Sequence, residues 1–338
     1  MLDRHTPTAH AAYHDLLASL KDEVVMDVRG TPTKVERGGK TYWYDTFRVG
    51  TDVRKAYIGE DTPELAPRLE QLTMLRAQAG SRQEGRTRLI RILRAEGFMR
   101  IDAATGSLMA AMAKAGVYRL GGTIVGTHAF RLYEGELGLR YRFDDTAQTR
   151  DMDIASFERL SLALEDVVSP RLEDVFRDFS FVPVPDLKPG NVWRWQQTRG
   201  ELMVEFLTPS FDADETIRPL AALGVDAQSL HHLNYLIEQP ILAAVPYRSG
   251  VLVQIPQPER FAIHKLIVAD RRQGGPDAIK SIKDRAQAAF LINALAEDRP
   301  DELREAYQMA RDKGPKWDMR LDNTLKKMPD TREILAGL

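Results

Sequence analysis

The chain has 338 residues, which is enough for two or three domains and a sizeable core. Its formal net charge is −2, so any contact with nucleic acid must come from a local basic patch. It has no cysteine, which excludes disulfides, thiolate metal sites and cysteine nucleophiles. The N-terminus lacks the apolar stretch of a signal peptide, and no apolar run approaches the ~20 residues that span a bilayer. We therefore expect a cytoplasmic protein with no membrane partner.

The N-terminal third is predicted to combine helices with a β-hairpin. Leucines at helical spacing predict a helix over residues 8–27. Aromatic-rich runs at 42–49 and 53–58 flank a Gly-Thr-Asp turn and predict two hairpin strands. A long helical region follows to about Gly97. We interpret residues 1–98 as an N-terminal helix and β-hairpin domain.

This N-terminal domain is also a candidate nucleic-acid arm. Between Arg76 and Arg100 the sequence has seven arginines against two glutamates, a local balance of +5. Aromatic faces beside cations suit base stacking and phosphate contact. The alternative, a half-buried sheet and a solvated helix face, fits the same pattern. The hairpin carries the aromatic residues Tyr42, Trp43, Tyr44, Phe47 and Tyr57 and the cations Lys40, Arg48, Arg54 and Lys55.

The middle of the chain, residues 99–257, is predicted to form a core of strands and helices. A helix at about 102–115 leads to a glycine-rich turn, and residues 128–133 continue as a helix. Strands are expected at 151–154 and 203–207, and three apolar runs punctuated by prolines predict further strands. These runs are 233–237, 241–245 and 251–255. From Pro258 onward the pattern is helical, which gives a C-terminal helical region of 258–338.

Two carboxylates downstream of the glycine-rich segment Gly121–Thr127 are the most informative feature. Asp151 and Asp153 are spaced i, i+2, so on a strand they point to the same face. Such a pair raises the pKa of each member unless a cation lies between them. Mg²⁺ is the usual cation, because it takes oxygen ligands and leaves room for substrate phosphates. A glycine turn can present backbone N–H groups to a phosphate, so the segment predicts an enzyme that acts on a nucleoside triphosphate.

The glycine turn does not match the phosphate loop of P-loop NTPases. Gly121 and Gly126 have the right spacing, but Thr127 and His128 stand where that loop needs lysine and then serine or threonine. A P-loop NTPase is therefore not predicted.

The motifs resemble the DNA-polymerase-β-like nucleotidyltransferase superfamily, and more closely a bacterial subgroup of uncharacterised nucleotidyltransferase-fold proteins. The likeness covers about residues 100–290. Two features depart from the superfamily pattern: a gap of 25 residues separates Gly126 from Asp151, and the third acid is Glu205 where aspartate is commoner. The matching segments are Val125-Gly126-Thr127, Asp151-Met152-Asp153, the strand that contains Glu205, and His264-Lys265-Leu266.

The resemblance implies an α+β fold with a polymerase-β-like nucleotidyltransferase core, a mixed sheet with helices. It implies transfer of a nucleoside monophosphate from an NTP to an RNA end, a protein hydroxyl or a small molecule. A toxin–antitoxin role follows by analogy only. The implied catalytic metal ligands for Mg²⁺ or Mn²⁺ are Asp151, Asp153 and Glu205, and the implied nucleotide-binding residues are Gly126, Thr127 and Lys265.

Rival interpretations of the same residues remain open. A non-catalytic nucleic-acid-binding or regulatory protein on a degenerate scaffold is the main alternative, and it gains if the three acids do not converge. Asp144 and Asp145 are rival carboxylates, although adjacent strand residues point to opposite faces. For Lys265 a solvated basic helix end is an equal alternative, and for Arg271, Arg272 and Lys280 it is the favoured one. His264 is interpreted as a packing residue.

Overall fold

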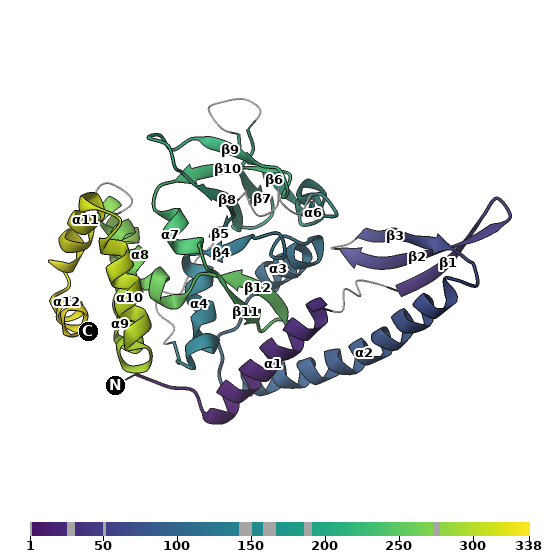
Figure 1. Cartoon of the computed structure of the whole chain (residues 1–338), viewed down its shortest axis with the longest axis horizontal. Helices are drawn as coiled ribbons and strands as arrows, with labels where there is room; N and C mark the ends of the chain where they lie inside the picture. Colours follow the sequence, from purple (N-terminus) through teal and green to yellow (C-terminus); the bar gives the residue numbers. More distant parts are fainter. Residues whose placement is uncertain are drawn as a thin grey trace.

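The computed structural model contains a three-stranded sheet, a central mixed sheet, a separate β-hairpin and helices around them (Figure 1). The predicted α+β class, with a mixed sheet and a C-terminal helical region, is confirmed. The structure describes residues 2–25, 31–49, 52–141, 151–157, 167–185, 191–272 and 278–338. None of the helices in these ranges combines the length and hydropathy that a bilayer span requires. Asp144 and Asp145, the alternative carboxylates for the predicted site, lie outside these ranges.

The N-terminal third places a small sheet at the end of two packed helices (Figure 1). The helix predicted over 8–27 and both predicted hairpin strands are present, and β1 is an additional strand that is too polar to show a strand pattern. Gly38 and Gly39, with φ of 61° and 76°, form the two-residue turn between β1 and β2 that requires left-handed backbone. The elements are α1 (Pro7–Val25), β1 (Thr31–Arg37), β2 (Lys40–Val49), β3 (Asp52–Glu60) and α2 (Ala66–Ala95).

The central sheet has the strand order β4-β5-β8-β10-β9, and β7 and β6 extend it beside β8. β5, β8 and β10 are mutually parallel, whereas β4, β7 and β9 run antiparallel to their partners. The strands are β4 (Thr123–Val125), β5 (Asp151–Ala155), β6 (Phe181–Pro183), β7 (Arg194–Gln197), β8 (Met203–Pro209), β9 (Ile217–Leu220) and β10 (Val225–Leu230).

Alternation along β5 and β8 decides which side chains enter the core. Met152 and Ile154 of β5 are fully buried, as are Val204 and Phe206 of β8. The residues between them therefore point to the opposite face of the sheet. That face carries the acidic residues of both strands.

Helices and a hairpin complete the core. α3 begins at Asp102, whose carboxylate accepts a hydrogen bond from the Thr105 N–H at 2.9 Å, and ends at Gly116 with φ of 95°. The hairpin of β11 and β12 confirms two of the three proline-bounded strands. These elements are α3 (Ala103–Ala115), α4 (Gly126–Leu137), α6 (Leu172–Asp178), α7 (Leu233–Ile237), β11 (Ile241–Val245) and β12 (Val251–Ile255).

The prediction of a strand at 233–237 is wrong, because this segment forms helix α7. His232, with φ of 72°, turns the chain at its start. Leu233, Tyr235, Leu236 and Ile237 are all buried, so no face of the segment shows a strand-like alternation. A short apolar run of this kind cannot be told from a strand by periodicity.

The C-terminal region is helical in its described part, as predicted, and prolines open four of its helices. One continuous hydrophobic cluster joins residues of α3, the central sheet and the C-terminal helices. The domain boundaries at 98/99 and 257/258 stay a prediction. The helices are α8 (Pro258–Arg271), α9 (Ala278–Asp298), α10 (Pro300–Arg311), α11 (Pro315–Leu325) and α12 (Pro329–Gly337).

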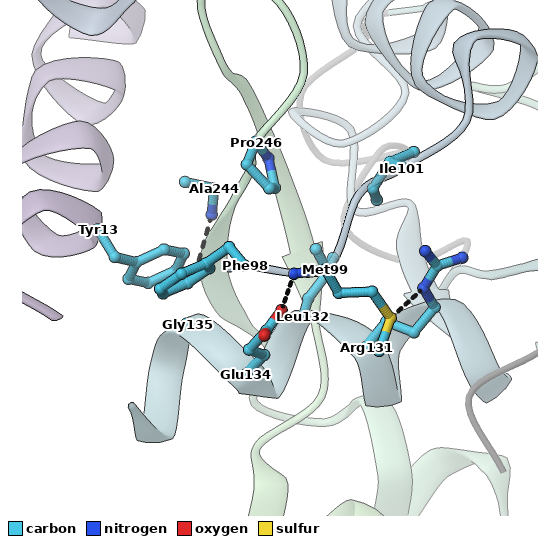
Figure 2. A pocket seen from close by; sticks show the side chains of 10 residues that line it. All are labelled: Tyr13, Phe98, Met99, Ile101, Arg131, Leu132, Glu134, Gly135, Ala244 and Pro246. Carbon is cyan, nitrogen blue, oxygen red and sulfur yellow. Dashed lines mark hydrogen bonds between the residues drawn. The ribbon is translucent and has the colours of Figure 1, made fainter. Parts of the chain in front are cut away.

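Close packing holds the N-terminal segment against α4 (Figure 2). The Tyr13 ring of α1 lies so near Gly135 that a Cβ atom there would come within 2.2 Å of it. The Tyr13 hydroxyl accepts a hydrogen bond from the Ala244 N–H of β11 at 3.2 Å. The buried Glu134 carboxylate accepts from the Met99 N–H at 2.8 Å and contacts His5 Nε2 at 3.0 Å.

A methyl group at Gly135 should disrupt this contact. We expect Gly135→Ala to lower the free energy of unfolding by about 1–3 kcal/mol, because an overpacked interior must shift the Tyr13 ring. Urea denaturation followed by circular dichroism measures the change. Gly80→Ala is the matched control: it adds the same methyl to exposed α2 with no atom within 4 Å, and should leave stability unchanged or raise it. Equal effects of the two variants would contradict the packing argument.

Candidate active site

The parallel pairing of β5 with β8 brings two of the predicted acids together. Asp153 and Glu205 are direct partners across the two strands, and their side chains share a hydrogen bond. Burial, followed by repulsion from Asp151, raises the pKa of the Asp153 carboxyl. Burial, followed by repulsion from Asp153, raises the pKa of Glu205 to about 7. Two carboxyls can hydrogen-bond only if one keeps its proton, which the raised pKa values allow.

Asp151 lies two residues before Asp153 on the same face of β5, as the i, i+2 spacing predicts. Its negative charge contributes to the raised pKa of both Asp153 and Glu205, so the three carboxyls share one region. Within the described ranges, however, no three histidine, aspartate or glutamate side chains surround a common point as the ligands of a metal ion do. The acids are gathered, but they are not arranged as a finished metal cage.

Gly126 supplies the bend on which the Asp153 carboxylate rests. β4 pairs Val125 with Asp153, and α4 begins at the next residue. Gly126 has φ of 65°, and a Cβ there would lie 2.5 Å from Asp153 Oδ2. Only glycine therefore allows both the left-handed backbone and the close approach of the carboxylate.

The start of α4 is a site for negative charge. Thr127 is buried in its first turn, and no side chain caps the helix at Val125. The first N–H groups of a helix have no partner within the helix, and its dipole favours anions there. The predicted nucleotide-binding pair, Gly126 and Thr127, thus lies at a helix N-terminus beside Asp153.

Lys265 approaches the acids from α8. Its Nζ donates to Asp284 Oδ1 at 2.6 Å, and Arg272 donates to Asp284 Oδ2 at 2.8 Å. The positive charges of Lys265 and Arg272 partly offset the rise in the pKa of Asp153, which places both near that carboxylate. Lys265 also lies 5.2 Å from the centre of the Phe261 ring, one turn earlier on the same helix face.

Arg271 and Lys280 of the second predicted constellation are exposed, as residues of a solvated helix end would be, and Arg272 is half-buried. Arg271 binds Glu215 with two hydrogen bonds of 2.8 and 3.0 Å, and Arg272 is paired with Asp284. His264 is buried, as a packing residue should be, and burial lowers its pKa well below the usual range.

Arg194 is a site residue that sequence reasoning missed. It lies directly opposite Glu205 in the antiparallel pairing of β7 with β8, with 3.8 Å between its NH1 and Glu205 Oε1. Its guanidinium stacks on Trp193 at 4.3 Å, which fixes its direction. The alternation of Trp193, Arg194 and Trp195 is compatible with a strand, but nothing in it points to Glu205.

The raised pKa of Glu205 should make stability fall as pH rises. Its folded pKa of about 7 exceeds the unfolded value of 4.5, so the folded state binds the proton more tightly. The stabilisation from that proton is complete below pH 4.5 and is lost by about pH 7. Glu205→Gln, which cannot ionise, should gain on the order of 2 kcal/mol over wild type between pH 5 and pH 8. Urea denaturation of both proteins in EDTA measures this, and a difference that does not change with pH would contradict it.

Comparisons with known proteins match the part of the chain that contains this site. Residues 103–312 match a family model described as Nucleotidyltransferase, which covers more than half of the chain. Residues 9–67 match a second model, a domain of unknown function called DUF6788. No curated protein is significantly similar to the chain.

One solved structure is also similar to the chain. It is the crystal structure of an antigenic nucleotidyltransferase-like protein from Paracoccidioides brasiliensis, with 16% identity, a TM-score of 0.35, and coverage of 69% of this chain and 92% of that one. Because the family match extends over more than half of the chain, the chain belongs to the nucleotidyltransferase family.

Proposed function

We propose that this nucleotidyltransferase moves a nucleoside monophosphate from an NTP to an acceptor hydroxyl, with Mg²⁺ or Mn²⁺ as cofactor. The observation that carries the proposal is the placement of Asp153 beside Glu205 and over the Gly126 backbone. This placement puts an acidic pair next to a helix N-terminus, where phosphate groups can bind. An RNA end, a protein hydroxyl and a small molecule are the candidate acceptors, and a toxin–antitoxin role would require an acceptor whose modification stops growth.

The acidic residues fit a divalent metal by the chemistry of their donor atoms. Carboxylate oxygens are the ligands that Mg²⁺ prefers. Burial, and then repulsion between neighbouring carboxyls, raises the pKa of Asp153 and of Glu205, and a bound cation would offset both effects. Asp151, Asp153 and Glu205 would hold the metal. When bound, it would supply positive charge that stabilises the oxygens of the displacement at the α-phosphate.

The side chains around the acids would bind the nucleotide and accept a proton. Backbone N–H groups of Gly126 and Thr127 would donate to phosphate oxygens at the start of α4. Lys265, held by Asp284 in this structure and close enough to Asp153 to lower its pKa, would bind the triphosphate. Glu205 would accept the proton of the acceptor hydroxyl. The hydroxyl oxygen then bonds to the α-phosphorus and pyrophosphate leaves.

The degenerate-scaffold alternative would gain if the three acids did not converge. The pairing of Asp153 with Glu205 supports the catalytic proposal instead. Glycine at 126, where a Cβ would lie 2.5 Å from Asp153 Oδ2, keeps that carboxylate at the start of α4.

Label transfer from each α-³²P NTP tests the proposed activity. Incubation with Mg²⁺ or Mn²⁺ and total RNA, cell protein or small-molecule extract should label one acceptor class. Asp151→Asn, Asp153→Asn and Glu205→Gln should each reduce transfer at least about 100-fold, because each removes a carboxylate that would hold the metal. Glu173→Gln, which alters an exposed carboxylate of α6, should behave as wild type. Absence of labelling with every combination, or equal labelling by wild type and Asp153→Asn, would refute the proposal.

A methyl group at position 126 should also impair catalysis. Gly126→Ala must displace the Asp153 carboxylate, because the new Cβ would lie 2.5 Å from Oδ2. We expect at least about a tenfold fall in kcat, since a displacement of about 1 Å can cost 100-fold. Gly85→Ala, which meets no atom within 4 Å on α2, is the control. Unchanged kcat in Gly126→Ala would show that the contact between Gly126 and Asp153 has no part in the reaction.

A further inference from the structure

The outer face of α2 carries arginines that have no ion-pair partner. Ile90 and Leu93 face the core, and Arg86 is buried with its guanidinium bound to Glu23 at 2.9 Å and to the Ser249 carbonyl at 3.0 Å. Three other arginines of this half of the helix, Arg88, Arg91 and Arg94, are exposed. Arg88, Arg91 and Arg94, together with Arg100 just beyond the helix, form no hydrogen bond or ion pair through their side chains with any described residue.

A groove lies at the C-terminal end of this arginine row. It encloses about 320 Å³ between the end of α2, the segment 98–101 and Pro246. Arg94 and Arg100 border it, and its other lining residues are apolar: Leu93, Phe98, Met99, Ile101 and Pro246. Figure 2 shows the adjoining pocket, which shares Phe98, Met99, Ile101 and Pro246 with it. We call this groove, with Arg88, Arg91, Arg94 and Arg100, the arginine groove.

The arginine groove is tied to α4, the helix that begins at Gly126. Arg131 of α4 donates to the Met99 sulfur at 3.0 Å (Figure 2). It also donates to the Arg100 carbonyl at 2.5 Å. Arg131 is five residues after Gly126, a rise of about 7.5 Å along a helix. Asp102, next to the groove, influences the pKa of His128 in the first turn of α4. The groove therefore ends close to the proposed nucleotide site.

We propose that the arginine groove binds single-stranded RNA that carries the acceptor hydroxyl. Unpaired guanidinium groups match phosphate oxygens in charge and geometry, and the apolar lining suits one unstacked base. A duplex keeps its bases stacked and could not use the groove, whereas RNA commonly presents unpaired strands. With a net charge of −2 on the whole chain, a local basic surface is the feature that such a partner requires. This inference rests on the proposed function and names its acceptor.

Fluorescence anisotropy with a 5′-fluorescein 12-nucleotide RNA of mixed sequence tests the binding without NTP and in EDTA. The full-length triple variant Arg91→Gln, Arg94→Gln, Arg100→Gln should bind at least about tenfold more weakly, and the slope of log Kd against log salt should fall by about 2. The control triple Lys316→Gln, Lys327→Gln, Arg332→Gln removes the same charge from exposed positions in α11, in α12 and between them, away from α2 (Figure 1), and should bind as wild type.

Three results would overturn the inference. The first is an equal loss of RNA binding in both triple variants, which would mean that the overall charge of the protein, and not the groove, determines the affinity for RNA. The second is competition by a 12-base-pair DNA duplex as effective as that by unlabelled RNA. The third is displacement of RNA by poly-glutamate at equal charge, which would indicate an acidic protein partner. Equal thermal unfolding of both triples and wild type confirms that the substitutions leave the fold intact.

The binding and transfer assays separate this inference from the proposed function. Asp153→Asn should bind the RNA like wild type while it transfers no label. If the protein transfers label from none of the NTPs but its RNA binding depends on the arginine groove, the proposed activity is refuted and the groove remains a binding site. If label enters RNA, the groove triple should raise KM for RNA without changing kcat. Unchanged KM would overturn the acceptor role.

Discussion

The parallel pairing of β5 with β8 is the constraint on which the site depends. It is a backbone arrangement, and it fixes two carboxyls side by side whatever their mutual repulsion. The hydrophobic side chains on the other face of both strands hold this register, because a shift by one residue would turn Val204 and Phe206 out of the core. The packing of the core thus maintains an electrostatic arrangement that would be unfavourable by itself.

Cations around the acids limit the cost of that arrangement without removing it. Arg194 approaches Glu205 only to 3.8 Å, and the positive charges of Lys265 and Arg272 are shared with the buried Asp284. Asp284 is only 1% exposed, and its two carboxylate oxygens accept hydrogen bonds from Lys265 and Arg272. The cations nearest to Asp153 are consequently held in place by another carboxylate, while the raised pKa values of Asp153 and Glu205 persist. A site organised in this way favours additional positive charge beside the acids and a negatively charged group beside Lys265.

The features that the sequence predicts well are those whose causes are local. The bend at Gly126, the same-face placement of Asp151 and Asp153, and the helix from residue 258 each follow from neighbouring residues. Glu205 was identified through a motif, since its place opposite Asp153 depends on strand pairing across the chain. Arg194 and the partnership of Lys265 with Asp284 had no local signal. The strands β6, β7, β9 and β10 were missed for a related reason: they are short or largely polar, and β9 contains Pro219, which is unfavourable in an interior strand.

The position of α2 relative to the site follows from the packing of the N-terminal segment. Tyr13 fills the space left by Gly135, Glu134 joins His5 to the Met99 N–H, and Arg131 holds the carbonyl of Arg100. All three contacts involve α4, the helix whose first residue is Gly126. A rigid helix transmits its own orientation, so α2 and the segment 98–101 are fixed with respect to the phosphate-binding end of α4. A strand bound along the arginine groove would therefore meet the acidic face at a defined distance, which is what a transferase needs to select one hydroxyl of a long acceptor.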